Sequence, residues 1–299
     1  MFRHLLIPLD GSSLAERVLS AATALAAKLS AKLTLLHVLE KHAKAHVHAD
    51  RHLTDADEAE SYLRQLAARL PPDLQIDWHV HTDRVGDVAR SLVEHADEVQ
   101  ADLIAITTHG AGGLSRVLFG SIAEQVLTRC RRPVLLSPVR YAGPLDVFPL
   151  EQILVPVDIG PGHAQGTELG VRLAAACQAA LTLVAVAPTL AGLGVRRTTA
   201  AQLQPAAPAV LLEIEAEQLA QALRATEQQA RDFGVRVSTQ LLRGNPAECL
   251  LEAIASAQPN LVVFASHARK GMDAFLDPGV GQQLCARAPV HLLVLPIGA

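Results

Sequence analysis

Residues 5–10 read LLIPLD, and residues 153–158 repeat this pattern as ILVPVD. Each stretch is a short, nearly continuous apolar run that ends in an aspartate. Such runs are typical of strands buried on both faces of a parallel sheet. The two runs lie 148 positions apart, which is too far for the repeating unit of a solenoid. The pattern therefore indicates one domain present twice, each copy beginning with a buried strand.

The repeat continues along both halves of the chain. Residues 102–106 (DLIAI) correspond to residues 260–264 (NLVVF), and residues 133–136 (PVLL) correspond to residues 289–292 (PVHL). The order of the matches is the same in both halves, so a whole domain has been duplicated. The second copy contains additional residues between its first strand and the stretch that begins at residue 260. We expect them within Pro188–Pro208.

A segment with three prolines, Pro138–Leu150, joins the two copies. Proline restricts the backbone and interrupts helices and strands, so the segment is typical of a connection between domains. We place the boundary near Asp146. The predicted domains are residues 1–145 and residues 146–299.

Short apolar runs alternate with helical patterns within the first copy. Strands are expected at residues 4–9, 33–38, 75–80, 103–107 and 134–137, and helices at residues 15–29, 56–70, 85–98 and 122–128. Buried strands separated by helices predict a parallel sheet covered on both faces. The expected fold class is α/β, with two tandem doubly wound five-stranded parallel-sheet domains of Rossmann-like type. The patterns S-x-x-E at Ser13 and Ser121 predict capping boxes at two helix starts.

Composition narrows the classes of function. Half of the 299 residues are apolar and 19% are charged, which excludes a disordered chain. The net charge of −4 argues against a nucleic-acid partner. No apolar stretch approaches the length of a membrane span, so no membrane contact is expected. The four cysteines form no C-x-x-C pair and there is no apolar secretory leader, so we expect reduced thiols and a cytoplasmic location.

The stretch from Thr107 to Ile122 is the candidate ligand-binding segment. It reads TTHGAGGLSRVLFGSI, follows an expected strand and precedes an expected helix. Glycines allow a ligand to approach the backbone, and a helix N-terminus favours a phosphate group. A glycine-rich loop before an ordinary capped helix explains the same residues, so both interpretations stay open. The motifs G-x-x-x-x-G-K-[ST] and G-x-G-x-x-G are absent, which excludes the standard P-loop and dinucleotide-binding folds.

These motifs resemble the universal stress protein family in its tandem form, over nearly the whole chain. The family's ATP motif reads G-x-x-G, nine residues, then G-[ST]. Gly110, Gly120 and Ser121 match it, whereas Thr107 stands at the position of the first glycine. The run from Ile7 to Ser12 and the triplet LHV that ends at Val38 are also similar to the family pattern.

The resemblance implies an adenine-nucleotide site for ATP, with or without Mg²⁺, in the first domain only. Its residues would be Asp10, Val38, Thr107, Gly110, Gly120, Ser121 and Ile122. Asp10 would contact the nucleoside and the backbone of Val38 the adenine. The two glycines, Ser121 and the amide of Ile122 would hold the phosphates. The Thr107 replacement places a side chain on the adenosine side of the site.

The second copy has lost most of this motif. Residues 265–280 contain no Gly-Ser pair, and Asp273 and Asp277 add negative charge where phosphates would lie. Asp158 persists at the end of the first strand of the copy. We expect the second site to be vestigial.

Two other groups of residues suggest chemistry less strongly. Five histidines lie close together in the sequence: His37, His42, His46, His48 and His52. Their irregular spacing favours a solvated loop over a metal site, so no metal is expected. Cys130 is adjacent to Arg129, Arg131 and Arg132, whose charges would lower the pKa of its thiol, and a redox role is the weaker alternative.

Three functions remain open at this stage. The chain is expected to be a nucleotide-binding protein of stress response or signalling, acting with an unknown protein partner. The alternatives are an interaction scaffold that binds no nucleotide, and a slow ATPase. No catalytic base or nucleophile can be placed, so any ATP hydrolysis should be incidental. The resemblance also implies that residues 134–137 and 290–295 pair within one chain as a pseudo-dimer, and a homodimer of two chains stays open.

Overall fold

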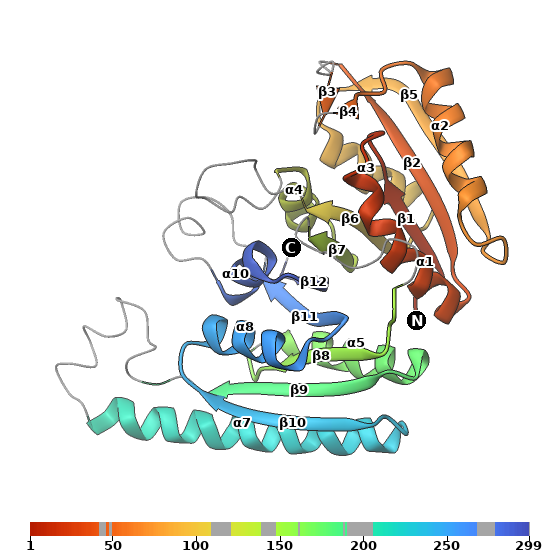
Figure 1. Cartoon of the computed structure of the whole chain (residues 1–299). Coiled ribbons are helices and arrows are strands. Elements are labelled where there is room, and N and C mark those ends of the chain that lie inside the picture. Colours follow the sequence, from red (N-terminus) through yellow and green to blue (C-terminus); the bar gives the residue numbers. More distant parts are fainter. Residues whose placement is uncertain are drawn as a thin grey trace. The chain divides into compact units, whose positions relative to one another are not determined.

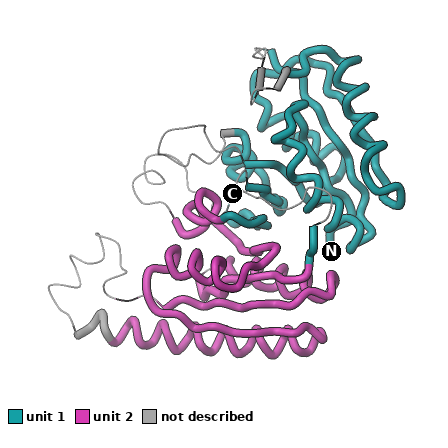
Figure 2. The backbone as a smooth tube through the Cα atoms, viewed as in Figure 1, with its two compact units in different colours: residues 1–150, 289–299 teal, residues 151–288 magenta. Residues whose placement is uncertain are grey.

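The structure is a computed structural model that describes residues 1–41, 46–47, 50–108, 121–138, 148–160, 162–187, 189, 206–267 and 279–298. The side chains of residues 46, 47, 50, 51, 121 and 206–209 are outside this description. The chain divides into two compact units, shown in different colours in Figure 2. Unit 1 contains residues 1–150 and 289–299, and unit 2 contains residues 151–288.

Unit 1 is built on a mostly parallel sheet (Figure 1). Its strands are β1 (His4–Pro8), β2 (Lys32–Glu40), β5 (Ile76–Val85), β6 (Leu103–Thr108), β7 (Val134–Pro138) and β12 (His291–Ile297). They lie in the order β5-β2-β1-β6-β7-β12, and the first five are parallel to one another. The short strands β3 (His46–Val47) and β4 (Asp50–Arg51) form a separate antiparallel pair.

Helices cover both faces of this sheet. They are η1 (Ala15–Arg17, a 3₁₀ turn), α1 (Val18–Leu29), α2 (Ala56–Arg69), α3 (Val88–Glu98) and α4 (Ser121–Arg129). The chain first adds β2 and β5 on one side of β1, and after β5 it adds β6 and β7 on the other side. Right-handed crossovers therefore place α1 and α2 on one face and α3 and α4 on the other. The packing of α3 against α4, and of α2 against β2 and β5, agrees with this arrangement.

The core of unit 1 follows from its apolar runs. Leu5, Leu6 and Ile7 in β1 are fully buried, and β2 has seven consecutive buried residues. Burial of successive residues on both faces is what a doubly covered parallel strand requires. Two helices start at acceptor side chains: Asp55 caps α2 through the amides of Asp57 and Glu58, and Asp87 caps α3.

Unit 2 repeats this construction. Its described strands are β8 (Gln152–Val157), β9 (Ala180–Ala187), β10 (Val237–Arg243) and β11 (Leu261–His267), all parallel, in the order β10-β9-β8-β11. The helices are α5 (His163–Cys177), α7 (Ala206–Asp232), α8 (Pro246–Ala257) and α10 (Val280–Arg287). α5 packs against α7, and α8 packs against α10, so the helices pair by face as in unit 1.

The expected fold class is confirmed. The last strand of the second copy, β12, pairs with a strand of the first copy. β12 pairs antiparallel with β7, through Leu292 with Leu136, Leu293 with Leu135 and Val294 with Val134. β12 is therefore counted with unit 1 by its contacts. The pairing expected between residues 134–137 and 290–295 is confirmed, and it covers an edge of the sheet that would otherwise expose unpaired backbone groups.

Several boundaries differ from the expected ones. β5 continues to Val85 and α3 begins at Val88, whereas the sequence predicted a strand that ends at residue 80 and a helix from residue 85. The predicted capping box at Ser13 is wrong, because the N-caps of η1 and α1 are Leu14 and Arg17, and neither makes a side-chain capping bond. α7 has 27 residues and α2 only 14, so part of the second copy's extra length is helical.

Gly166 permits a close approach of α5 to β11. A Cβ at Gly166 would lie 2.9 Å from the carbonyl carbon of Phe264 and closer still to the amide nitrogen of Ala265. These are backbone atoms, so no side-chain rotation relieves the clash. We predict that Gly166→Ala lowers the free energy of unfolding by about 1–3 kcal/mol, despite the better helix propensity of alanine. Urea denaturation measures this loss.

Gly86→Ala is the matched control, since a Cβ at Gly86 would meet nothing within 4 Å. Its unfolding midpoint should stay near that of the wild type. Equal effects of the two substitutions would contradict the close helix–sheet contact.

His291 in β12 makes stability depend on pH. Its ring is fully buried and packs edge-on against Phe148, with ring centroids 4.7 Å apart. Burial lowers its pKa to about 4. The unfolded chain, with an ordinary histidine pKa near 6.5, binds the proton first as the pH falls. Stability should therefore decrease between about pH 6.5 and pH 4, by up to roughly 3 kcal/mol.

His291→Phe removes this titration while keeping an aromatic ring. Its loss of unfolding free energy between about pH 7 and pH 4.5 should be smaller than that of the wild type by about 2–3 kcal/mol. Urea denaturation at both pH values measures the difference, and an equal loss in the two proteins would show that His291 does not carry it.

Candidate functional site

The site expected from the sequence lies where the strand order of unit 1 reverses. β1 has β2 on one side and β6 on the other, and the connections that leave β1 and β6 diverge there. Ligands of open α/β sheets bind in the crevice beyond the carboxyl ends of the strands at this point. Asp10 follows β1, Val38 lies in β2 and Thr107 lies in β6, so three of the expected residues come from adjacent strand ends.

Strand register brings these three positions to within one residue of the same level. Pro8 is opposite Leu36, and Leu6 is opposite Ile104. Continued by two and by three residues, these registers place Asp10 abreast of Val38 and residue 9 abreast of Thr107. The sheet therefore gathers the expected residues of the nucleoside side at one edge.

A tight turn holds the carboxylate of Asp10. Its Oδ1 accepts hydrogen bonds from the amide of Ser12 at 2.9 Å and from the hydroxyl of Ser12 at 2.6 Å. This is an Asx-type turn, in which an aspartate binds the backbone two residues further on. Gly11 has φ of +88°, and a Cβ there would lie 2.7 Å from Leu53 Cγ, so only glycine fits. The sequence DGS thus fixes the direction of this carboxylate.

Val38 stands at an irregularity of the sheet. It is buried, and it pairs with His81 of β5, but the register shifts between Val38 and Glu40. The bulge interrupts the ladder between β2 and β5 after Val38, and its additional residues belong to β5. The interruption coincides with the position whose backbone is expected to meet an adenine.

Thr107 directs its side chain into the core. It is buried, and its hydroxyl donates to the carbonyl of Ala15 at 3.2 Å. The residue that replaces a glycine of the family motif thus ties β6 to the helical turn after the Asp10 loop. Its neighbour Thr108 donates to the carbonyl of Ser137 in β7 at 3.2 Å. Both threonines therefore serve the packing of the strand end.

The phosphate half of the expected site is only partly described. Gly110 and Gly120 lie outside the described residues. Ser121 is the first residue of α4 and Ile122 the second, and the side chain of Ser121 lies outside the description. α4 follows β6 in the chain and begins at the expected position, so its first amides belong to the residues predicted to face phosphate.

The histidine segment after β2 is not the solvated loop that its composition suggested, as far as it is described. His37 and His52 are buried. The ring nitrogens of His37 lie 2.7 Å from the carbonyl oxygen of Leu9 and 3.1 Å from that of Leu53. His37 therefore connects the end of β1 to the segment before α2. His42, His48 and the side chain of His46 lie outside the described residues.

The expected effect of the arginines on Cys130 is wrong. The thiol is fully buried, and burial raises its pKa. Its sulfur accepts from the amide of Arg132 at 3.3 Å, but desolvation outweighs the nearby positive charge. A raised pKa keeps the thiol protonated, so the redox interpretation loses its support. No disulfide links any of the four cysteines, Cys130, Cys177, Cys249 and Cys285.

Unit 2 fills the corresponding place with its own side chains. Asp158 follows β8 as Asp10 follows β1, and its carboxylate accepts from the amide of Gly160 at 3.1 Å. His163 Nδ1 lies 3.5 Å from the same carboxylate, and its ring packs edge-on against His267 of β11. Asp158 is thus engaged by the first residue of α5.

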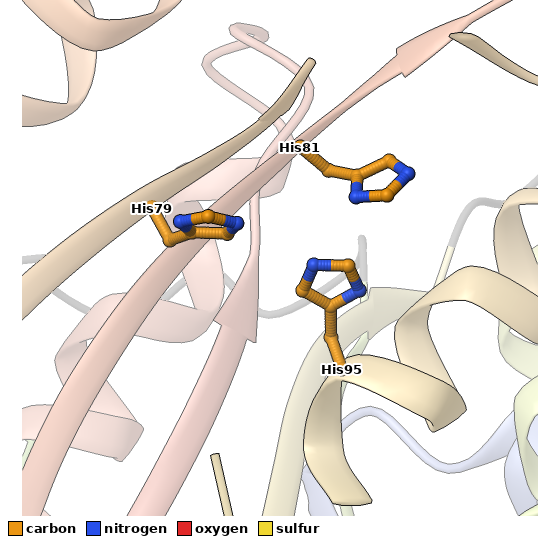
Figure 3. Close-up of side chains that lie close together, drawn as sticks. All are labelled: His79, His81 and His95. Atoms are coloured by element: carbon orange, nitrogen blue, oxygen red, sulfur yellow. The ribbon is translucent and has the colours of Figure 1, made fainter. Parts of the chain in front are cut away.

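One cluster of candidate metal-binding side chains was not predicted from the sequence. His79 and His81 of β5 and His95 of α3 converge in unit 1, as Figure 3 shows. One ligand-type nitrogen from each ring lies within 4.8 Å of the other two. The H-x-H pattern at the end of a predicted strand was the available signal, because residues two apart in a strand share a face. The third histidine becomes a neighbour only through the fold.

Among the described residues, no helix is both long enough and apolar enough to cross a membrane.

Comparison with known proteins agrees with the duplication. The sequence model of the universal stress protein family matches residues 1–138 and again residues 149–296. A universal stress protein of Methanocaldococcus jannaschii is 29% identical over 139 residues, which cover 46% of this chain and 82% of that protein. A universal stress protein A homolog of Coxiella burnetii is 30% identical, over 42% of this chain and 89% of that protein.

A solved structure shares the architecture over the whole length. The crystal structure of a universal stress protein from Archaeoglobus fulgidus matches with a TM-score of 0.70 and 18% identity. The match covers 99% of this chain and 98% of that one, so the likeness extends over both units and concerns the fold.

The turn at Asp10 should contribute to stability. In Asp10→Ala, the amide and the hydroxyl of Ser12 lose their acceptor, and Ser12 is only 1% exposed. An unsatisfied buried polar group costs about 1–3 kcal/mol, so we predict a loss of that size in the free energy of unfolding. Asp158→Ala is the control, since that carboxylate is exposed, and its loss should be smaller. The opposite order in urea denaturation would contradict the structural role of Asp10.

Proposed function

The chain belongs to the universal stress protein family, and on this premise we propose that its first domain, residues 1–145, binds an adenine nucleotide. The second domain, residues 146–299, binds none. The bound nucleotide serves stress response or signalling by changing what the chain presents to a protein partner. The cytoplasmic location expected from the sequence stays a prediction.

One observation carries the proposal. In the sequence, the motif Gly110, Gly120 and Ser121 lies between β6 and α4, and β6 is the neighbour of β1, the strand that Asp10 follows. A phosphate motif alone is common in α/β proteins. Here it is combined with a carboxylate held in a fixed direction at the point where the strand order reverses. A nucleotide site needs such a combination, because the base, the sugar and the phosphates are each bound by different protein groups.

The phosphates would lie at the start of α4. The first amides of a helix lack intrahelical acceptors, and the helix dipole adds partial positive charge. Ser121 supplies a hydroxyl and Ile122 an amide there, while the glycines let phosphate oxygens approach the backbone. Mg²⁺ would accompany the nucleotide as a phosphate counterion.

The nucleoside would lie over β1 and β2. Asp10 offers a carboxylate whose Oδ1 is already oriented by Ser12, which suits contact with sugar hydroxyl groups. The bulge at Val38 supports recognition of adenine by backbone groups. Thr107 leaves room because its hydroxyl points to Ala15.

The side chains of unit 2 support a silent second domain. The contact of His163 with Asp158 occupies the carboxylate that corresponds to Asp10. A Cβ at Gly281 of α10 would lie 2.9 Å from the Cβ of Ser266, so the helix in the place of α4 lies tightly against the end of β11. Both features limit the room for a ligand in unit 2.

Binding without efficient turnover is the proposed activity. Oδ1 of Asp10, the carboxylate of the proposed site, accepts two hydrogen bonds from Ser12. Among the described residues we identify no general base that would activate a water molecule. Hydrolysis of ATP should therefore be slow, and an assay of phosphate release with and without Mg²⁺ measures it.

Calorimetric titration of ATP–Mg²⁺ into nucleotide-free protein tests the proposal. We predict one site per chain in the wild type. Gly120→Val should lower the affinity at least tenfold, which is about 1.4 kcal/mol, because the valine side chain blocks the approach of phosphate.

Gly279→Val is the matched control, since Gly279 precedes α10 as Gly120 precedes α4 and has an ordinary φ of −61°. It should leave both stoichiometry and affinity unchanged. Two sites per chain would contradict the silent second domain. Absence of binding to the wild type would favour the interaction scaffold.

A further inference from the structure

We propose that His79, His81 and His95 form a binding site for a divalent transition-metal ion of the zinc type. The site lies in unit 1, on the face of the sheet that α3 covers. It is independent of the proposed nucleotide site, since it uses none of the residues of that site.

All three histidines lie in regular secondary structure, two in β5 and one in α3. His79 and His81 are two residues apart in β5, so both point to the same face of the sheet. His95 projects from α3 toward them, as Figure 3 shows. The ring centroids of His81 and His95 are 4.6 Å apart with planes at 86°, and those of His79 and His95 are 5.4 Å apart.

The ligand nitrogens are close to the spacing that a metal requires. All three lie within 4.8 Å of one another. Tetrahedral zinc with Zn–N bonds of about 2.0–2.1 Å needs nitrogens roughly 3.3 Å apart. His79 is exposed and His81 half-buried, so both rings can close the remaining distance by rotating their side chains. His95 is buried and provides the fixed point.

The hydrogen bond of His95 selects the free ring nitrogen. Nδ1 of His95 donates to the carbonyl of Ser91 at 3.1 Å. This leaves Nε2 as the metal-facing atom, and a backbone carbonyl behind one nitrogen is the common arrangement of metal-binding histidines. Glu98 Oε2 lies 3.7 Å from this Nε2 and can supply a fourth ligand or hold a water.

The charge beside the rings comes from one carboxylate. A pocket of about 310 Å³ adjoins the rings, and His81 and His95 line it together with acidic and basic side chains in equal number: Asp87, Glu94, Glu98, Lys41, Arg84 and Arg90. Asp87 and Glu94 are engaged by Arg129 and Arg90. The carboxylate next to the rings is that of Glu98, which would repel a phosphate and attract a metal ion.

The ligand type indicates the class of metal ion. Imidazole ligands prefer Zn²⁺, Cu²⁺ and Ni²⁺ over Mg²⁺ or Ca²⁺.

Titration of ZnCl₂ into the metal-free, nucleotide-free full chain tests the proposal by calorimetry. We expect one Zn²⁺ per chain, and at least a tenfold lower affinity in His79→Gln and in His81→Gln. His79 is exposed and His81 is not fully buried, so these variants should fold, and their circular dichroism should match that of the wild type. MgCl₂ should give no comparable heat.

The matched control is His163→Gln combined with His267→Gln, which removes the two-histidine contact of unit 2. It should bind Zn²⁺ as the wild type does. Equal loss of affinity in the control, or binding that survives in His79→Gln and His81→Gln, would overturn the site.

Co²⁺ identifies the ligands directly. With histidine ligands it should give the visible bands of a tetrahedral ion, and these should disappear in His79→Gln. Bands from sulfur-to-cobalt charge transfer would instead place the metal on cysteine and overturn the proposal. Because no nucleotide is present, failure of this test leaves the proposed nucleotide site untouched, and failure of ATP binding leaves the metal site untouched.

Discussion

The carboxyl end of β1 is the position on which the rest of unit 1 depends. Parallel strands need crossover connections, and the reversal of strand order at β1 sends those connections to opposite faces. Backbone groups at this end must find partners that are not in the sheet. Asp10 binds Ser12, and His37 reaches the carbonyl of Leu9, so two polar side chains complete the strand end. The end of β1 is therefore polar, and the fold itself holds these polar groups in place.

The duplicated copies show how the same backbone can carry different chemistry. Each has an aspartate after its first strand, but Asp10 binds a serine in its own turn, whereas Asp158 faces a histidine of the next helix. α1 has Val18 and Ala22 where α5 has Gly166 and Gly170, and these glycines bring α5 close to its sheet. The copies thus differ in the size of the residues by which this helix faces its sheet.

The sequence predicted what depends on local periodicity. β1 and its repeat were evident because buried parallel strands are continuous apolar runs, and the helical pattern of residues 56–70 predicted α2 within one residue. Contacts between distant elements were not predictable in this way. The pKa of Cys130 was assigned from three arginines that are neighbours in sequence, while burial decides its direction. The approach of His95 to β5 required the crossover between them to be known. The pairing of β7 with β12 was expected only through the family resemblance.

That pairing has a kinetic and evolutionary consequence. A single-domain protein that pairs its last strand with another copy must find that copy by diffusion, so its assembly depends on concentration. Here β12 follows from the same chain as β7, and the association is intramolecular, at an effective concentration that dilution cannot change. The partner is also always the other half of the same molecule. Substitutions in one half therefore never meet themselves across the contact, and the two halves are free to specialise.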